Sequence, residues 1–593
     1  MNLRRVRRVV QFVIFHFLVM ILPFIGYSQG YDPKTTDQKL TSALQIIRFA
    51  YVDTVNESAI VEKAVIEMLK KLDPHSIYIS KDDLEESIEP LEGNFEGIGV
   101  QFQIFNDTIL VIAPIPGGPS EKLGIIAGDK IVKIEGVSVT GSEVTTTYVQ
   151  KLLRGKKGTK VKIGVYRKGK HDLIDFTIVR DRVPVNSIVA SYMTAPEIGY
   201  IKLTRFSRTT MYEFETLVLN LLESGMKNLV LDLRGNSGGY LSTAIELSDE
   251  FLGKNKLIVY TEGIASPVKK YFATNRGIFE KGKIVILIDE GSASASEIVA
   301  GAIQDWDRGI IVGRRSFGKG LVQRPFPMPD GSLIRLTTAR YHTPTGRCIQ
   351  RPYDNGVEEY YNELVERYLN GEFIHADSIH FPDSLKYFTP HKRLVYGGGG
   401  ITPDAFVSID TTHMTNYYSD LRKNEVFNDF ALMYLDNYRD SIVQLYPAFE
   451  DFNMNFEIDK KFLGLFKGYA SLKGVVEENA EPKIVDLFIE FLENNKDTLQ
   501  EKYSTAEIFA SKFPEEKELI DEFMDYVKDH GDHQEEIAYT EEIIKYQIKA
   551  LLSRNLYGLN SYYQVISEMD DDLQKAIEIL EDPDFFKENK IQD

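Results

Sequence analysis

Two runs of consecutive, mostly apolar residues constrain the fold of this chain more than any other feature. They are Leu229–Leu233 and Ile284–Ile288, and each is followed by a loop rich in glycine and serine and then by a helical pattern. Such runs are typical of strands buried on both faces of an α/β sheet, and the order of strand, loop and helix predicts βα crossovers. Because active sites in these sheets commonly lie at the carboxyl ends of the strands, both loops are candidate sites.

Length and composition indicate several folded domains and exclude a nucleic-acid partner. The chain has 593 residues, which corresponds to about three or four domains at roughly 150 residues each. Hydrophobic residues make up 43% and charged residues 26% of the chain, as in a folded globular protein. The net charge of −19 opposes phosphate binding, which depends on clustered Lys and Arg. The only cysteine, Cys348, cannot form an intramolecular disulfide, so the domains must be held by their cores alone.

Residues 1–28 have the pattern of a secretory signal peptide. A basic start, MNLRRVRR, precedes an apolar run from Val9 to about Ile25, and small residues follow at a plausible cleavage point. A retained membrane anchor is the alternative, in which an uncleaved N-terminus would associate the protein with a membrane. Either interpretation predicts an exported protein that works in the periplasm or another extracytoplasmic space.

Changes of pattern divide the remaining chain into four predicted parts. Residues 35–95 show the three- and four-residue spacing of helices in a small N-terminal domain, and residues 97–182 show short alternating strands with glycine-rich turns. Residues 185–410 alternate between strands and helices and contain both candidate loops. Residues 411–593 form an acidic, helical C-terminal extension, for example at 482–492, with no repeat and no chemical motif. We expect this extension to serve packing or assembly.

The strand-rich part resembles a PDZ domain. The resemblance rests on Gly97-Ile98-Gly99-Val100 and on residues 119–124 and 124–136. A PDZ domain binds a peptide by adding it as a strand to an exposed sheet edge, while backbone amides of a turn hold the terminal carboxylate. The resemblance implies that Gly97, Ile98, Gly99 and Val100 bind the peptide, since glycines let the backbone approach a ligand. A glycine-rich domain that acts as a passive spacer is the alternative.

The first glycine-rich loop offers Ser237 as a candidate nucleophile. Its GNSGG core, at residues 235–239, is the pattern expected around the nucleophile of a trypsin-like protease, which also needs a histidine and an aspartate. Only His75 and His171 precede it in the mature chain, and each fits a turn in another domain. A trypsin-like domain would also be all-β, whereas Ser237 follows an α/β strand. The sequence therefore favours the second loop.

The second loop, GSASASE, offers Ser294 at the start of a helix. Ser294 to Glu297 fits a capping box, which explains both residues without catalysis. Small alanines between the serines would also let a substrate carbonyl approach the amides of the helix start. A predicted strand at 309–313 delivers Lys319, and burial would lower its pKa from about 10.4 toward values at which a lysine can act as a base. Gln323, four residues on, could orient this lysine.

Taken together, these motifs resemble the carboxyl-terminal processing peptidases, a family of PDZ-containing Ser/Lys proteases. The resemblance covers roughly residues 38–410 and includes LDPHS at 72–76, both loops, FGKG at 317–320 and RLTTARY at 335–341. It implies that Ser294 is the nucleophile, Lys319 the general base and Gln323 the third member of a triad. The amides of Ala295 and Gly239 would then bind the oxyanion, with no metal and no cofactor.

Two further residues match positions described in some relatives. Arg154 resembles an arginine linked to substrate-dependent activation, although an ordinary exposed arginine fits the sequence equally well. Asp305 occupies the position of an acidic residue on the nucleophile helix. It lies about three turns beyond Ser294, so we interpret it as a surface charge.

The resemblance implies a multidomain α/β fold class and a proteolytic function. The fold would be a crotonase-like α/β protease core with an inserted PDZ domain, a helical N-terminal domain and a helical C-terminal extension. The expected protein is an exported serine endopeptidase that binds C-terminal tails of proteins through its PDZ domain and cleaves near the C-terminus. Its partners would be proteins with accessible C-termini. The sequence is also compatible with a homo-oligomer or with an adaptor partner. A catalytically inactive PDZ scaffold is the alternative.

Overall fold

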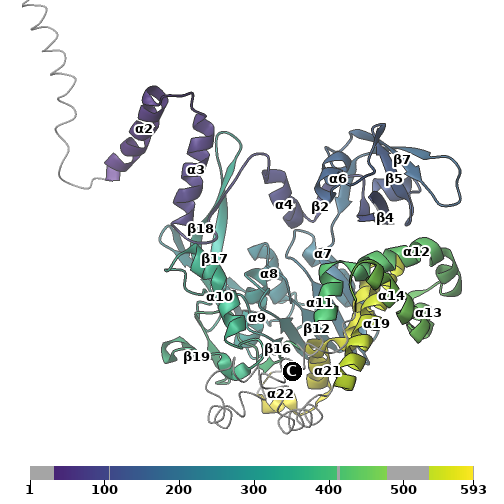
Figure 1. Ribbon diagram of the computed structural model, residues 1–593. Helices are drawn as coiled ribbons and strands as arrows, with labels where there is room; N and C mark the ends of the chain where they lie inside the picture. The colour runs from purple at the N-terminus through teal and green to yellow at the C-terminus, as the bar shows by residue number, and fades with distance from the viewer. Residues whose placement is uncertain (1–32, 106, 411–414, 477–532, 590, 592–593) are drawn as a thin grey trace, which may run out of the picture. The chain divides into compact units, whose positions relative to one another are not determined.

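The computed structural model describes residues 33–105, 107–410, 415–476, 533–589 and 591 (Figure 1). The signal-peptide prediction and the predicted helical run at 482–492 lie outside the described residues. The chain divides into two compact units, with the division after Leu72. In the part of the chain that the structure describes, no helix has the length and apolar character needed to cross a membrane.

The first unit contains helices α2 (Pro33–Ala50) and α3 (Glu57–Lys70). Helix α3 begins after Asn56, whose side chain accepts a hydrogen bond of 3.2 Å from the Ala59 amide. The predicted helices are therefore confirmed. Their apolar stripe is not buried within this unit, since Leu40 is 55% exposed and only Leu69 is buried in α3.

The α/β prediction for the central part is confirmed by a six-stranded sheet in the order β10-β11-β12-β15-β16-β21. All neighbouring strands are parallel except β10 and β11. The two apolar runs form the central strands β12 and β15, and the predicted strand after them forms β16. The strand bounds are β10 Ile188–Ala195, β11 Ile198–Leu203, β12 Asn228–Asp232, β15 Ile284–Ile288, β16 Ile310–Gly313 and β21 Ala405–Phe406.

Side chains of this sheet alternate between two buried cores, one on each face. Leu229, Leu231 and Ile286 pack against helices α7 (Thr210–Glu223), α8 (Leu241–Asp249) and α9 (Ala295–Asp305). Val230 and Leu287 face the other way and pack against α21 (Asp571–Glu581). The expected packing role of the C-terminal extension is thus confirmed at this helix, which closes the second face of the sheet.

A second, antiparallel sheet carries the end of the predicted lysine segment. Its order is β1-β18-β13-β14, and β17 also pairs with β18. In this pairing Gln323 of β17 lies opposite Thr337 of β18. The bounds are β1 Ile77–Ile79, β13 Leu257–Gly263, β14 Ser266–Phe272, β17 Leu321–Pro327 and β18 Leu333–His342, and α10 (Val357–Leu369) follows.

The PDZ segment is a sheet in the order β3-β4-β5-β7-β8, with β6 paired to β5. Strand β3 lies at the edge, and helix α6 packs on the buried core of the sheet. The strands before and after this segment, β2 and β9, pair with each other, so both ends of the segment meet. The bounds are β2 Asn94–Gly97, β3 Val100–Phe105, β4 Thr108–Pro114, β5 Lys130–Ile134, β6 Val137–Ser138, α6 Thr146–Leu153, β7 Lys160–Tyr166, β8 Ile174–Val179 and β9 Asp181–Pro184.

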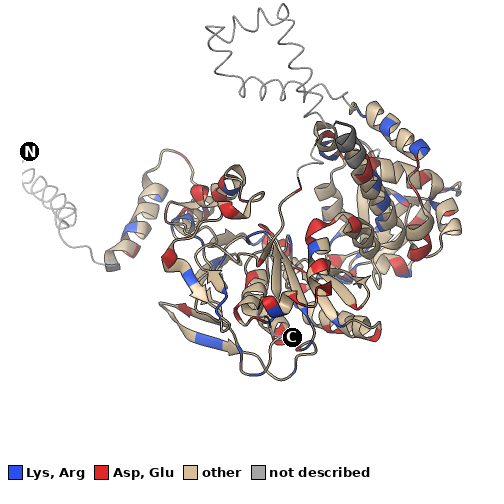
Figure 2. Ribbon diagram, turned by 90° about the horizontal axis from the view of Figure 1, so that it is seen from below, with Lys and Arg blue, Asp and Glu red and all other residues tan. Residues whose placement is uncertain are grey.

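The C-terminal extension begins with a helical domain whose core is rich in aromatic side chains. Phe430, Phe452 and Phe466 are fully buried in it. Acidic and basic residues are interspersed along the described elements (Figure 2). The helices are α11 Asn416–Lys423, α12 Val426–Leu445, α13 Phe449–Asn455, α14 Lys460–Leu472 and α19 His533–Tyr557, and α20 (Leu559–Ile566) leads to α21.

Candidate active site

The serine cluster after β15 forms the start of helix α9. Ser292 and Ser296 are buried and donate hydrogen bonds of 2.9 and 2.8 Å to the carbonyl oxygens of Leu233 and Asn236. These two serines therefore fasten the loop to the end of β12. Ser294, between them, lines a cavity of about 1150 Å³ and has a φ of 55°. A positive φ is strained for a residue with a Cβ atom, and such strain is concentrated at functional sites.

Glu297 binds the serine loop and the lysine loop at the same time. Its Oε2 accepts hydrogen bonds from the amides of Ser294 (2.7 Å) and Lys319 (2.9 Å). Its Oε1 accepts from the Ser316 hydroxyl (2.6 Å) and the Gly318 amide (2.7 Å). The capping box correctly predicted the bond to Ser294. The other three bonds make Glu297 the link that fixes Lys319 relative to the start of α9.

Glu297 is fully buried, and its environment is built for a carboxylate. Burial raises the pKa of Glu297 above its ordinary value of 4.5, while the four hydrogen bonds that it accepts act in the opposite direction. Donors on both oxygens are the arrangement that an ionised carboxyl group requires.

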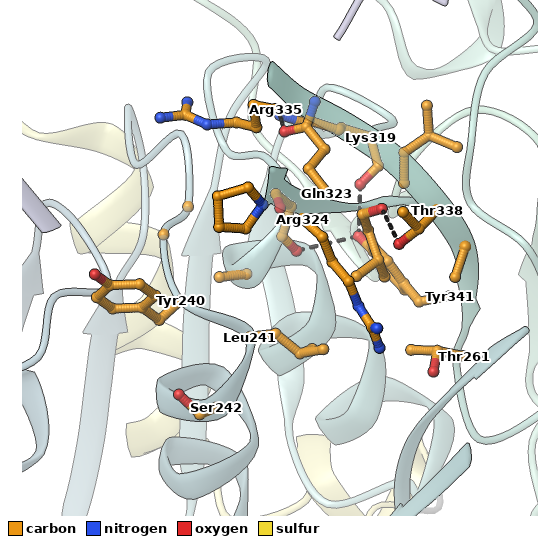
Figure 3. Close-up of a pocket in the computed structure, with 18 of the residues that line it drawn as sticks. Tyr240, Leu241, Ser242, Thr261, Lys319, Gln323, Arg324, Arg335, Thr338 and Tyr341 are labelled. Carbon is orange, nitrogen blue, oxygen red and sulfur yellow. Dashed lines mark hydrogen bonds between the residues drawn. The ribbon is translucent and has the colours of Figure 1, made fainter. Parts of the chain in front are cut away.

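Lys319 lies on the loop between β16 and β17, beside Gln323. Its Nζ is 3.4 Å from the Gln323 Oε1, as the predicted role of Gln323 requires (Figure 3). Burial lowers the pKa of Lys319 below its ordinary value of 10.5, and the nearby Arg335 cation lowers it further. Both effects increase the fraction of neutral lysine, which is the form that can accept a proton.

The turn at residues 73–76 holds the other end of Gln323. The Gln323 Nε2 donates a hydrogen bond to the His75 carbonyl oxygen. Asp73 Oδ1 accepts from the amides of His75 and Ser76, each at 2.8 Å, and this fixes the turn. Burial lowers the pKa of His75 to about 3, and the Lys319 cation contributes. His75 is therefore a neutral turn residue, as its sequence context indicated, and its backbone positions Gln323.

The GNSGG loop packs directly against Ser294. A Cβ atom on Gly238 would lie 2.9 Å from the Ser294 Cβ, so only glycine fits this approach. Gly239 has a φ of 152°, and a Cβ there would lie 2.1 Å from the Phe206 carbonyl oxygen. Among the described residues, the amides of Gly239 and Ala295 donate to no acceptor. Both amides are therefore available to a ligand.

One cavity of about 1150 Å³ brings the predicted catalytic and oxyanion residues together. Figure 3 shows Lys319 and Gln323 among the residues that line it. Ser294, Lys319, Gln323, Ala295 and Gly239 all line it. Apolar side chains of helix α4 (Leu84–Glu92) and of the antiparallel sheet form much of its wall. A cleft of this size and apolar character is suited to a peptide segment. Ser237 also lines the cavity, on the exposed side of the GNSGG loop.

Sequence reasoning missed Tyr341 as a site residue. Its buried hydroxyl lies 2.7 Å from the Lys319 carbonyl oxygen and 3.1 Å from the Ser294 carbonyl oxygen. Tyr341 thus contacts the backbone of both loops. Its phenol has one proton, so it donates to one of the two carbonyl oxygens at a time. Its place in the RLTTARY motif was the one available indication.

The structure gives specific partners to the two residues that match positions in relatives. Arg154 forms an ion pair with Glu89 of α4, a helix that lines the cavity, and its guanidinium lies 5.0 Å from the centre of the Phe95 ring. Asp305 is only 1% exposed and pairs with the buried Arg347. The interpretation of Asp305 as a surface charge is therefore wrong. Its carboxylate balances a buried cation.

A second buried cluster of charges ties the GNSGG segment to the C-terminal extension. The Arg234 guanidinium donates to Asp232 and Asp570, each at 2.6 Å, and to Asp572 at 2.9 Å. Lys202 donates to the Arg234 carbonyl oxygen at 3.0 Å. Arg234, which directly precedes the GNSGG loop, is thus held by side chains from the start of α21.

The serine, the lysine and the two free amides lie at the carboxyl ends of the parallel strands. Together with the α/β sheet, they define a serine-type peptidase. Comparison with known proteins agrees with this class. A model described as peptidase family S41 matches residues 197–361, a PDZ-domain model matches residues 97–178, and a model of a family of unknown function matches residues 417–486 and 483–558.

The similarity extends over most of the length of two bacterial relatives. The chain is 34% identical over 358 residues to the carboxy-terminal-processing protease of Bartonella bacilliformis, covering 58% of this chain and 80% of that protein. It is 35% identical over 340 residues to the carboxy-terminal processing protease CtpA of Bacillus subtilis, covering 57% and 71%. A solved photosystem II D1 C-terminal processing protease is 25% identical, with a TM-score of 0.34 and coverage of 63% and 87%. The chain belongs to the carboxy-terminal processing proteases of peptidase family S41, so the trypsin-like alternative is wrong.

Proposed function

We propose that the protein is an exported serine endopeptidase that binds C-terminal tails of protein substrates through its PDZ domain and cleaves them near the C-terminus. The observation that carries the proposal is the hydrogen bonding of Glu297 to both Ser294 and Lys319. These hydrogen bonds hold the two candidate catalytic residues in the wall of one cavity, next to the free amides of Ala295 and Gly239. The basic and apolar N-terminal pattern supports export, and the family resemblance supports a crotonase-like fold of the core.

In the proposed mechanism, the Ser294 hydroxyl attacks the substrate carbonyl and neutral Lys319 accepts the hydroxyl proton. Lys319 then returns this proton to the leaving amine, and Gln323 holds the lysine side chain in place. The amides of Ala295 and Gly239 donate to the oxygen of the tetrahedral intermediate. Water then takes the place of the departed amine and attacks the acyl ester as Lys319 accepts its proton. Lys319 returns this proton to the Ser294 oxygen, the ester bond breaks, and the carboxylic acid product leaves the regenerated serine.

The PDZ turn supports the binding part of the proposal. Gly99 has a φ of 75°, and a Cβ there would lie 3.3 Å from the Gly118 Cα, so this turn requires glycine. Within the described residues, the amides of Ile98 and Gly99 donate to no acceptor. Free amides beside an edge strand are the arrangement that holds a terminal carboxylate in this class of domain.

The dependence on a free C-terminus tests this function. An unstructured substrate with a free terminal carboxylate should be cleaved at least about tenfold faster than the same substrate with an amidated end, because amidation removes the charge that the turn binds. Mass spectrometry of the products gives both rates and the cleavage positions. A Gly99→Ala variant should reduce the difference between the two substrates. Tail binding without cleavage of either substrate would support the inactive scaffold instead.

Cleavage should also rise with pH. Lys319 must be neutral to accept a proton, and its pKa lies below 10.5, so kcat/KM should increase as pH rises and level off with a midpoint below 10.5. His75, with a pKa of about 3, is neutral throughout this range. Replacing Arg335 by glutamine removes a cation that lowers the pKa of Lys319, so the midpoint should move upward. A pH profile measured between about 5 and 10 checks this, and an unchanged midpoint would contradict the assignment of Lys319 as the base.

A further inference from the structure

A groove of about 610 Å³ runs along the free edge of the PDZ sheet. Strand β3 pairs with β4 on one side, and its other side is the edge of the sheet. Residues 102–104 of β3 and Thr146 at the start of α6 form one wall of the groove. The helical domain forms the other wall, where Arg422, Asn428 and Arg554 lie on α11, α12 and α19. The groove therefore lies along the sheet edge at which a PDZ domain adds a peptide strand.

Specific contacts hold the helical domain against the PDZ sheet. Gln103 and Asn428 exchange hydrogen bonds through their side-chain amides, at 2.9 and 3.3 Å. Lys130 pairs with Asp436 at 3.1 Å. Leu432 of α12 belongs to a small buried cluster with apolar side chains of β3 and β4. These polar and apolar contacts together define the second wall.

The alternation of side chains along β3 shows which tail positions this wall would contact. Val100 and Phe102 pack on the PDZ core below α6, whereas Gln103 points to the opposite side and reaches the helical domain. An added strand has the same alternation as the sheet that it joins. Counting the C-terminal residue as position 0 beside Val100, an antiparallel tail places position −2 beside Phe102 and position −3 beside Gln103. Side chains at −3 therefore face the helical domain.

The part of the groove near Gln103, where position −3 would lie, has a net positive charge. The Arg554 Nη2 donates to Asn428 Oδ1 at 3.0 Å, but its buried Nε has no hydrogen-bond acceptor. In the described part of the chain no carboxylate pairs with Arg554, and burial lowers its pKa. Arg422 is exposed at the rim, and Glu425 is the one acidic side chain that lines the groove. A partly buried guanidinium without a carboxylate partner favours an anionic ligand.

We propose that the helical domain completes the peptide-binding groove, and that Arg554, with Arg422 at the rim, binds an acidic side chain at position −3 of the substrate tail. This inference rests on the proposed binding of C-terminal tails by the PDZ domain. In this chain, the segment that matches the family of unknown function would then take part in substrate selection. Position −3 would then be a specificity position in addition to the terminal carboxylate.

Binding of two labelled peptides to the full-length Ser294→Ala protein tests the proposal. The peptides have the same ten residues and a free C-terminus, and differ only in glutamate or glutamine at −3. Fluorescence anisotropy should show about tenfold tighter binding of the glutamate peptide, which corresponds to one charge-assisted hydrogen bond. Adding Arg554→Gln should remove this preference, whereas Arg554→Lys, which keeps the charge, should retain part of it.

The controls separate this inference from the proposed function. Lys460→Gln removes the same charge from an exposed position of the helical domain outside the groove, and it should leave the preference unchanged. If Arg554→Gln unfolds at a lower temperature, the exposed Arg422→Gln serves in its place and should weaken the preference. Equal binding of both peptides would overturn the role of the helical domain and leave tail binding intact. Binding of neither peptide would overturn the proposed tail recognition itself, and this inference with it.

Discussion

Replacing Ser294 by alanine is expected to reduce turnover of an unfolded protein substrate by about 10⁴-fold or more. The variant lacks the hydroxyl that would attack the carbonyl, and the free amides and the cavity alone provide only a small residual rate. Turnover should be measured by mass spectrometry of the products, because it reports both the rate and the cleaved bonds. The variant should still bind C-terminal tails, since the PDZ turn does not line the cavity of Ser294.

Ser237→Ala is the matched control for this experiment. Ser237 lines the same cavity and belongs to the loop that resembles a trypsin-like site, but it is exposed. We expect its replacement to leave most of the turnover. Lys319→Ala should resemble Ser294→Ala, because it removes the proton acceptor while leaving the serine in place. Retained activity in Ser294→Ala, or loss of activity in Ser237→Ala alone, would reverse the assignment of the nucleophile.

The positions of Ser294 and Lys319 could be predicted because the fold of the core follows from local patterns. Each residue follows a short apolar strand, and the two strands, β15 and β16, are parallel neighbours in one sheet. The carboxyl ends of parallel strands meet at one edge, so loops that follow them converge there. Glycines mark where the backbone must approach closely, as Gly238 does beside Ser294. Strand pattern and loop composition were therefore sufficient to place both loops at the carboxyl ends of neighbouring strands, whereas the choice of Ser294 and Lys319 within them came from the family resemblance.

Contacts that join distant segments could not be read from the same patterns. The capping box accounts for one hydrogen bond of Glu297, but the bonds to Gly318 and Lys319 depend on how the lysine loop folds back. The hydroxyl of Tyr341 reaches both loops from β18, whose pairing decides where this side chain points. Helix α21 has an ordinary amphipathic pattern, which does not tell which surface it covers. In each case the missing information is a tertiary packing partner.

The carboxylate of Glu297 gives the second large expected effect. Glu297→Ala leaves four donors without their acceptor in a buried site, namely the amides of Ser294, Gly318 and Lys319 and the Ser316 hydroxyl. Each such loss costs about 1–3 kcal/mol, so we expect the free energy of unfolding to fall by about 4 kcal/mol or more. Denaturant titration followed by circular dichroism measures this change.

Glu297→Gln separates positioning from stability. The amide keeps the shape of the side chain but offers one acceptor oxygen and places an NH₂ group against donors that faced the second oxygen. We expect kcat to fall by at least about 100-fold, because a misplacement near 1 Å between nucleophile and base has this cost, while KM changes little. Glu290→Gln is the matched control. Glu290 lies in the loop between β15 and α9 and pairs with Arg314 at 3.1 Å, and its replacement should keep most of the activity. Near-normal kcat in Glu297→Gln would mean that the two loops keep their geometry without this carboxylate. The link between Ser294 and Lys319 would then have to lie elsewhere. Tyr341, whose hydroxyl contacts both loops, would be the next residue to replace.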